Sequence, residues 1–123
     1  MAVTFTNSGI VKLKAGASVS TAITDAQYTE LINEAEAALS IEAKIPAYEL
    51  VANYGNLNAN IKKILDDGAS SHAAVAAIAH DPASYSKIGE AAFIANVNWT
   101  RYLNVVRLLK EKQYTDWIKS IAV

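Results

Sequence analysis

The fold is decided by residues 60 to 112, NIKKILDDGASSHAAVAAIAHDPASYSKIGEAAFIANVNWTRYLNVVRLLKEK, which hold two long helical patterns separated by Pro82. In the first pattern, apolar and small residues recur three and four positions apart as far as His80, which is typical of one face of an α-helix. The residue before a proline is pushed out of the helical conformation, so this helix should end there. The second pattern runs from about residue 86 to residue 112. The stretch predicts two long helices joined by a short loop.

The first of these helices should be thin. Its second half is rich in alanine, at positions 73, 74, 76, 77 and 79, so neighbouring helices could approach it closely. Gly68 lies in the middle of the pattern and costs about 1 kcal/mol relative to alanine in a helix interior. This cost stands unless close packing uses the missing side chain of Gly68.

The second long helix carries more apolar residues than one face requires. Its main stripe consists of Ile88, Ala91, Ala92, Ala95, Trp99, Tyr102, Leu103, Val106 and Leu109. A second set lies on the opposite side, mixed with polar residues. One interpretation is a central helix that the bundle covers on most sides; the other is that the second set meets another subunit. The candidate subunit-interface residues are Phe93, Val97, Arg101 and Leu108.

A further helix is predicted from about residue 25 to residue 43. Thr24 and Gln27 fit a capping box, in which each side chain satisfies a backbone N–H of the first turn. Apolar residues then follow on one face: Tyr28, Leu31, Ile32, Ala35, Ala38 and Leu39. Pro46 stops the pattern. Residues 46 to 59 are ambiguous and could form one short helix that ends at Gly55, followed by a polar loop.

The first 24 residues differ from the rest, being rich in Thr, Ser, Val and Gly. Residues 10 to 14 mostly alternate apolar and basic side chains, which favours a half-buried strand. We expect either a flexible, weakly ordered arm or a β-like arm that pairs with a neighbouring subunit. In both cases, removal of residues 1 to 20 should leave the helical part folded.

The expected fold is all-α: a four- or five-helix bundle with a long central C-terminal helix and an extended, partly β-like N-terminal arm. A length of 123 residues indicates one globular unit, which we divide into an arm (1–24) and a helical domain (25–123). The chain has no cysteine, so disulfides and thiolate metal sites are excluded. We expect neither a signal peptide nor a membrane span, because no apolar run is long enough.

Catalytic chemistry has little support in the sequence. His72 and His80 lie about 12 Å apart along one helix, too far to share a metal ion. His72 is better explained as a core or interface residue, and His80 suits the negative end of the helix dipole. Neighbouring acids such as Asp66 and Asp67 point to different sides of a helix, which is typical of a solvated face. We therefore expect no enzyme activity, no cofactor and no metal.

Charge is distributed unevenly along the chain. Residues 1 to 24 and 87 to 123 are basic, whereas residues 25 to 67 carry eight acids against three bases. Such a distribution would suit head-to-tail association of subunits, which closes into a ring when the rotation allows it. The alternative is that the acidic and basic parts neutralise each other within one subunit.

Several short blocks resemble the head–tail connector (adaptor, or head-completion) proteins of tailed bacteriophages. These blocks are Ile32-Asn33-Glu34-Ala35-Glu36, Ile61-Lys62-Lys63-Ile64-Leu65-Asp66-Asp67, Ala76-Ala77-Ile78-Ala79-His80-Asp81, Ser84-Tyr85-Ser86, Gly89-Glu90-Ala91-Ala92-Phe93-Ile94-Ala95-Asn96-Val97, Leu108-Leu109-Lys110-Glu111-Lys112 and Asp116-Trp117-Ile118. Together they cover roughly residues 28 to 120. The match is a pattern of small helical blocks, and residues 1 to 24 depart from it.

The resemblance implies a structural protein that is made in the host cytoplasm and placed in the neck of the virion. Such proteins assemble as a homo-oligomeric ring, typically a dodecamer, between the portal protein and the tail or next neck protein. DNA passes through the ring without sequence-specific binding. The C-terminal segment would be a natural docking peg, with Tyr114, Trp117 and Ile118 as candidate docking residues. The alternatives are another neck, decoration or tail-completion virion protein, or a small helical binding module.

Overall fold

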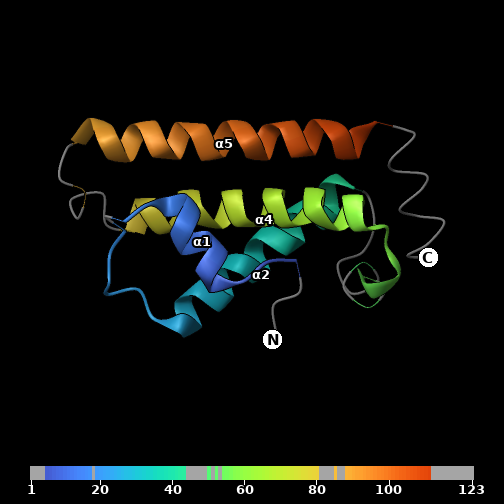
Figure 1. Ribbon diagram of the computed structural model, residues 1–123, viewed down its shortest axis with the longest axis horizontal. Helices are drawn as coiled ribbons and strands as arrows, with labels where there is room; N and C mark the ends of the chain where they lie inside the picture. Colours follow the sequence, from blue (N-terminus) through green and yellow to red (C-terminus); the bar gives the residue numbers. More distant parts are fainter. Residues whose placement is uncertain are drawn as a thin grey trace.

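The computed structural model describes residues 5–17, 19–43, 50, 52, 54–80, 85 and 88–111. This part of the chain is helical and contains no strand, which confirms the all-α prediction. Its elements are α1 (Ser8–Ala15), α2 (Asp25–Glu42), the short 3-10 helix η1 (Tyr54–Asn56), α4 (Ala59–His80) and α5 (Ile88–Lys110), shown in Figure 1. The two long helices predicted around Pro82 are α4 and α5.

The helix at the centre of the molecule is α4, which contacts α1, α2 and α5. Helix α5 runs antiparallel to α4 along one side of it, and α1 and α2 lie on other sides (Figure 1). The predicted central position of the C-terminal helix is therefore not observed. The physical reason is side-chain size: Gly68, Ala69, Ala73 and Ala77 are all buried in α4 and leave room for neighbours on several sides.

Two clusters of buried side chains hold the helices together. One includes Leu39, Leu65, Val105 and Leu109 and joins α2, α4 and α5. The other includes Val11, Ile32 and Ile78 and joins α1, α2 and α4. Burying each of these aliphatic side chains contributes about 1.5 to 3 kcal/mol. Burial of apolar surface therefore holds α2 to α4 in both clusters and α1 to α4 in the second.

Helix α2 begins where the sequence predicts it. The Thr24 hydroxyl accepts a hydrogen bond from the Gln27 backbone N–H at 3.2 Å, and the Gln27 side-chain oxygen accepts one from the Thr24 N–H at 2.8 Å. The predicted capping box is therefore present. The helix ends at Glu42, within one residue of the predicted end. Residues 44–49, including Pro46, lie outside the described residues.

The strand predicted over residues 10 to 14 is wrong, because these residues form part of α1. The Asn7 side chain caps the helix by accepting from the Ile10 N–H at 3.1 Å, and Gly16 ends it with a φ of 94°. Val11 and Ala15, four residues apart, are both fully buried. A run of only five alternating residues is compatible with both the period of a strand and the period of a helix. The capping contacts at both ends and the packing against α4 favour the helix.

Residues 8 to 15 are thus not an extended arm. The division of the chain at residue 24 stays a prediction, although α1 contributes to the same buried cluster as α2 and α4. The described helices include none with the length and apolar character needed to cross a membrane.

Candidate interaction surface

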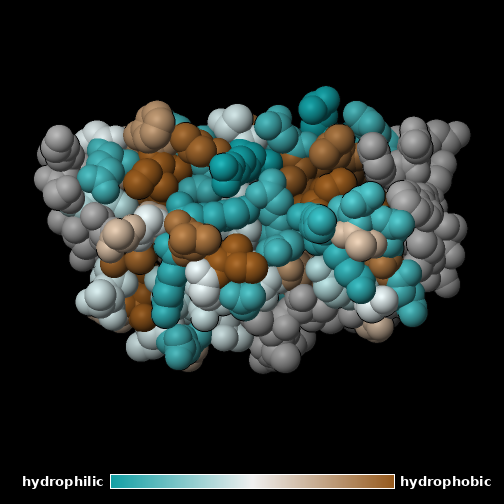
Figure 2. All heavy atoms as spheres, in the orientation of Figure 1, coloured by the Kyte–Doolittle hydropathy of each residue, from teal (hydrophilic) through white to brown (hydrophobic). Residues whose placement is uncertain are grey.

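The outer side of α5 exposes large apolar side chains. Phe93 is 69% exposed, Leu103 48%, Trp99 43% and Val97 39%. Figure 2 shows apolar patches along the upper edge of the molecule, over α5, separated by hydrophilic side chains. They form two exposed sets on different sides of the helix, Phe93 with Val97 and Trp99 with Leu103. Single exposed apolar residues are ordinary, whereas groups of them often mark an interaction surface. The exposed apolar residues of α5 are the main candidate site in the described part of the chain.

The structure places the predicted subunit-interface residues in two environments. Phe93, Val97 and Arg101 are exposed on α5, whereas Leu108 is partly buried. Their role as a subunit interface stays a prediction. The exposed surface extends beyond them to Trp99 and Leu103, which the sequence assigned to the main apolar stripe.

The buried stripe of α5 is narrower than predicted and contains a polar residue. It consists of Ala91, Asn98, Tyr102, Val105 and Leu109. Asn98 is only 2% exposed, and its side-chain amide donates to the backbone carbonyl oxygens of Lys14 and Ile94, both at 3.0 Å. Sequence periodicity could not identify this role, because Lys14 lies 84 residues away.

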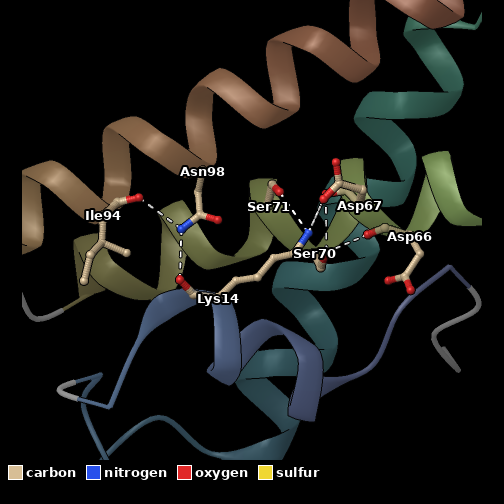
Figure 3. Close-up of polar contacts among 7 residues, drawn as sticks. All are labelled: Lys14, Asp66, Asp67, Ser70, Ser71, Ile94 and Asn98. Carbon is tan, nitrogen blue, oxygen red and sulfur yellow. Dashed lines mark hydrogen bonds and ion pairs between the residues drawn. The ribbon is translucent and has the colours of Figure 1, made fainter.

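The side chain of Lys14 crosses from α1 to α4, as Figure 3 shows. Its ammonium group forms an ion pair with the Asp67 carboxylate and also donates to the Ser71 hydroxyl at 3.1 Å. The Lys14 side chain is only 14% exposed, so this interaction is shielded from solvent more than an ordinary surface ion pair. The network joins α1, α4 and α5, which is a structural role.

His72 packs against aromatic rings. Its ring centroid lies 4.9 Å from that of Tyr102 and 6.3 Å from that of Trp99. Burial lowers the pKa of His72 below its ordinary value of 6.5, and the nearby Glu34 carboxylate opposes that shift. His72 is therefore a partly buried ring that is neutral at pH 7, packed as the predicted core or interface role requires. Its buried Nδ1 has no hydrogen-bond partner within the described residues, so the polar group is not satisfied as we expected.

The structure brings no catalytic constellation together around the predicted candidates. His80 is exposed at the end of α4, and no group of three potential metal ligands occurs among the described residues. A groove of about 480 Å³ runs between α2 and α4, lined by Ile23, Gln27, Glu30, Leu31, Glu34, Ala76, Ala79 and His80. Its acids and its apolar floor can accept a cationic side chain.

Three ion pairs within the subunit neutralise part of the charge asymmetry. The ion pairs found in the described residues all link a basic end of the chain to the acidic middle: Lys12 with Asp25 at 3.9 Å, Lys14 with Asp67, and Lys110 with Glu42 at 3.1 Å. Within this part of the structure, Glu30 and Glu34 on α2 and Arg101 on α5 form no such pair. These three exposed charges are among those available for a contact between subunits.

The candidate docking residues Tyr114, Trp117 and Ile118 lie outside the described residues, so their assignment stays a prediction. No protein-family model matches this chain, no curated protein is similar to it, and no solved structure matches it.

Proposed function

We propose that this protein is a structural component of the virion of a tailed phage, a head–tail connector that forms a homo-oligomeric ring between portal and tail. Two observations support the proposal. Short blocks between residues 28 and 120 resemble connector proteins, and α5 exposes apolar side chains that an isolated subunit leaves in water.

The exposed face of α5 carries the argument. The helix spans 23 residues, about 35 Å, and α4 supports it along its length. A long supported helix is a rigid element, so contacts along it fix the angle between neighbouring subunits. A ring requires a fixed angle at every contact. The proposed action is therefore geometric: each subunit holds a helix at a defined orientation, and the closed ring continues the DNA channel.

The proposed partners follow from the resemblance. The portal protein would bind one side of the ring, and a tail or further neck protein would bind the other side. Tyr114, Trp117 and Ile118 would anchor one of these partners. DNA would pass through without sequence-specific contacts, in a particle assembled in the host cytoplasm.

The test is the mass of the purified protein by light scattering, with negative-stain imaging of the same fractions, alone and after mixing with a portal ring. Closed rings in either condition would support the proposal. Phe93→Ser combined with Val97→Ser should prevent ring formation. Leu13→Ser is the matched control, because Leu13 is 80% exposed but lies on α1. A monomer in both conditions would contradict the proposal.

A small helical binding module is the second candidate function. The observation that favours it is the set of internal ion pairs from Lys12, Lys14 and Lys110, which leaves less free charge for ring assembly than the sequence predicts. A binding module would stay monomeric with a portal ring, and its exposed α5 face would contact an unrelated partner. The same light-scattering measurement separates the two functions.

A further inference from the structure

Helix α2 has an exposed row of its own, on the side opposite its buried residues. The row consists of Gln27, Glu30, Glu34, Ala37 and Ile41, spaced three and four positions apart. Ile41 is 75% exposed, which is unusual for an isoleucine. This row, which we call the α2 row, is acidic at its beginning and apolar at its end.

Helix α5 has a row with the reverse order. Phe93 and Val97 come first, and Arg101 follows after one further turn. We call Phe93, Val97 and Arg101 the α5 row. Because the α5 row runs from apolar to basic and the α2 row runs from acidic to apolar, an antiparallel pairing matches apolar with apolar and base with acid.

The spacing also matches. Phe93 and Arg101 are eight residues apart, about 12 Å along the helix, and Ile41 and Glu34 are seven residues apart, about 10.5 Å. Val97 lies four residues from Phe93, as Ala37 lies four from Ile41. Small Ala37 opposite Val97 allows the two helices to approach closely, because large side chains on one helix fit beside small ones on the other.

We propose that the α5 row of one copy of this chain packs antiparallel on the α2 row of a second copy. Phe93 lies against Ile41, Val97 lies against Ala37, and Arg101 lies between Glu30 and Glu34. This inference rests on the proposed function in one respect, since it names the contact by which ring subunits associate.

The acceptor for Arg101 is visible on α2. Glu30 and Glu34 lie one turn apart and border the 480 Å³ groove, with Leu31 beside them. Like charges at this spacing repel each other mildly, so a cation between them relieves the repulsion. An arginine suits the site because its planar head pairs with carboxylates while its stem covers apolar surface.

The two rows lie on different sides of the subunit, because α4 separates the main bodies of α2 and α5 (Figure 1). Each copy therefore offers its α5 row to one neighbour and its α2 row to another. A contact between two different surfaces is heterologous, and it yields a ring or an open chain rather than a closed dimer.

Crosslinking tests the pairing directly, since the natural chain has no cysteine. The protein is prepared as Phe93→Cys and, separately, as Ile41→Cys, and each is treated with a short bismaleimide alone and after mixing. We expect a crosslinked dimer only in the mixture. Leu103→Cys, exposed on another side of α5, is mixed with Ile41→Cys as the control and should give no product. A product from Phe93→Cys alone would overturn the pairing, because it would place α5 against α5.

Charge reversal tests Arg101. Arg101→Glu and Glu34→Arg should each weaken self-association at least tenfold in sedimentation experiments. A mixture of the two variants should recover association, because every contact between one variant and the other again places opposite charges at positions 101 and 34. Arg107→Glu is the matched control, since Arg107 is exposed on the same helix about 120° around the axis from Arg101 and should have little effect. Failure of the mixture to recover would overturn the assignment.

These results separate the pairing from the proposed function. Rings that form without the Phe93–Ile41 crosslink would retain the ring proposal and overturn the pairing. The crosslink with open chains in place of rings, with or without a portal ring, would support the pairing and contradict the connector ring. A monomer without any crosslink, even at the highest soluble concentration, would overturn the pairing.

Discussion

A Cβ atom on Gly68 would lie 2.7 Å from Cγ1 of Val105, closer than two carbon atoms can pack. The same Cβ would lie 3.1 Å and 3.2 Å from the two methyl carbons of Leu39. Gly68 therefore lies at a buried position where α2, α4 and α5 approach one another closely. The sequence left open whether close packing uses the missing side chain of Gly68, and the structure shows that it does.

Gly68→Ala should destabilise the protein. Alanine favours the helix by about 1 kcal/mol over glycine. The overlap with Val105, a branched and buried side chain, costs about 1 to 3 kcal/mol. We expect a net loss of up to about 2 kcal/mol in the free energy of unfolding, measured by urea denaturation and circular dichroism.

Gly89→Ala is the matched control, because nothing lies within 4 Å of an added Cβ at that position in α5. It should leave stability unchanged or raise it by up to about 1 kcal/mol. Val105→Ala should cost less in the Gly68→Ala background than in the natural chain, because it removes the overlap. Equal costs in the two backgrounds would refute the contact.

Asn98→Ala should loosen the attachment of α1 to α5. The substitution removes the amide that donates to the carbonyl oxygens of Lys14 and Ile94 at a position that is 2% exposed. Removing a buried hydrogen-bond partner costs about 1 to 3 kcal/mol. Urea denaturation measures the loss, and Asn96→Ala, exposed on the same helix, should be nearly neutral. A neutral result for Asn98→Ala would mean that the amide does not hold α1.

Deletion of residues 1 to 20 should destabilise the helical bundle, contrary to the expectation from the sequence. It removes fully buried Val11 and Ala15, the Lys14 ion pair with Asp67, and the oxygen of Ala15 that accepts from the Tyr85 hydroxyl at 2.6 Å. The expected loss is at least about 3 kcal/mol, from burial of apolar groups alone.

Thermal denaturation followed by circular dichroism measures this loss. Leu13→Ala serves as the comparison, since Leu13 is exposed on the same helix and should change stability little. An unchanged melting temperature after the deletion would restore the view of residues 1 to 20 as a dispensable arm.

His72 should contribute to loss of stability in acid. Because burial lowers its pKa in the folded protein, the folded and unfolded chains bind equal numbers of protons above the ordinary value of 6.5. As the pH falls below 6.5, the unfolded chain takes up a proton more readily, so the folded state loses stability until the pH passes the folded pKa. Protonation of carboxylates also destabilises the fold in acid. The contribution of His72 is therefore measured as the difference in stability loss between a His72 variant and the natural chain.

The measurement compares the urea midpoints of His72→Gln and the natural chain at about pH 7.5 and about pH 5. The variant should lose less stability than the natural chain over this range. His80→Gln, at an exposed position, should behave like the natural chain. Equal losses for His72→Gln and the natural chain would contradict the lowered pKa.

Features that depend on neighbouring residues were predictable. The capping box of Thr24 and Gln27 closes over four residues, and the ends of α4 and α5 follow from Pro82 and from the helical period. For Gly68 the sequence indicated only a cost of about 1 kcal/mol that close packing could offset, and the structure supplied the contact. Hydrogen bonds and periodicity of this kind involve residues within a few positions of each other.

The sequence by itself determined the all-α class, the two long helices around Pro82 and the existence of surplus apolar residues on α5. Only the tertiary structure decided that residues 10 to 14 are helical, that α4 occupies the centre, that Asn98 is buried and Trp99 exposed, and that Lys14 meets Asp67. The physical reason is that a helix with apolar residues on several sides can be covered on any of them. The side that is covered depends on which distant helices pack against it. The small buried residues of α4 allow the other helices to pack closely around that helix.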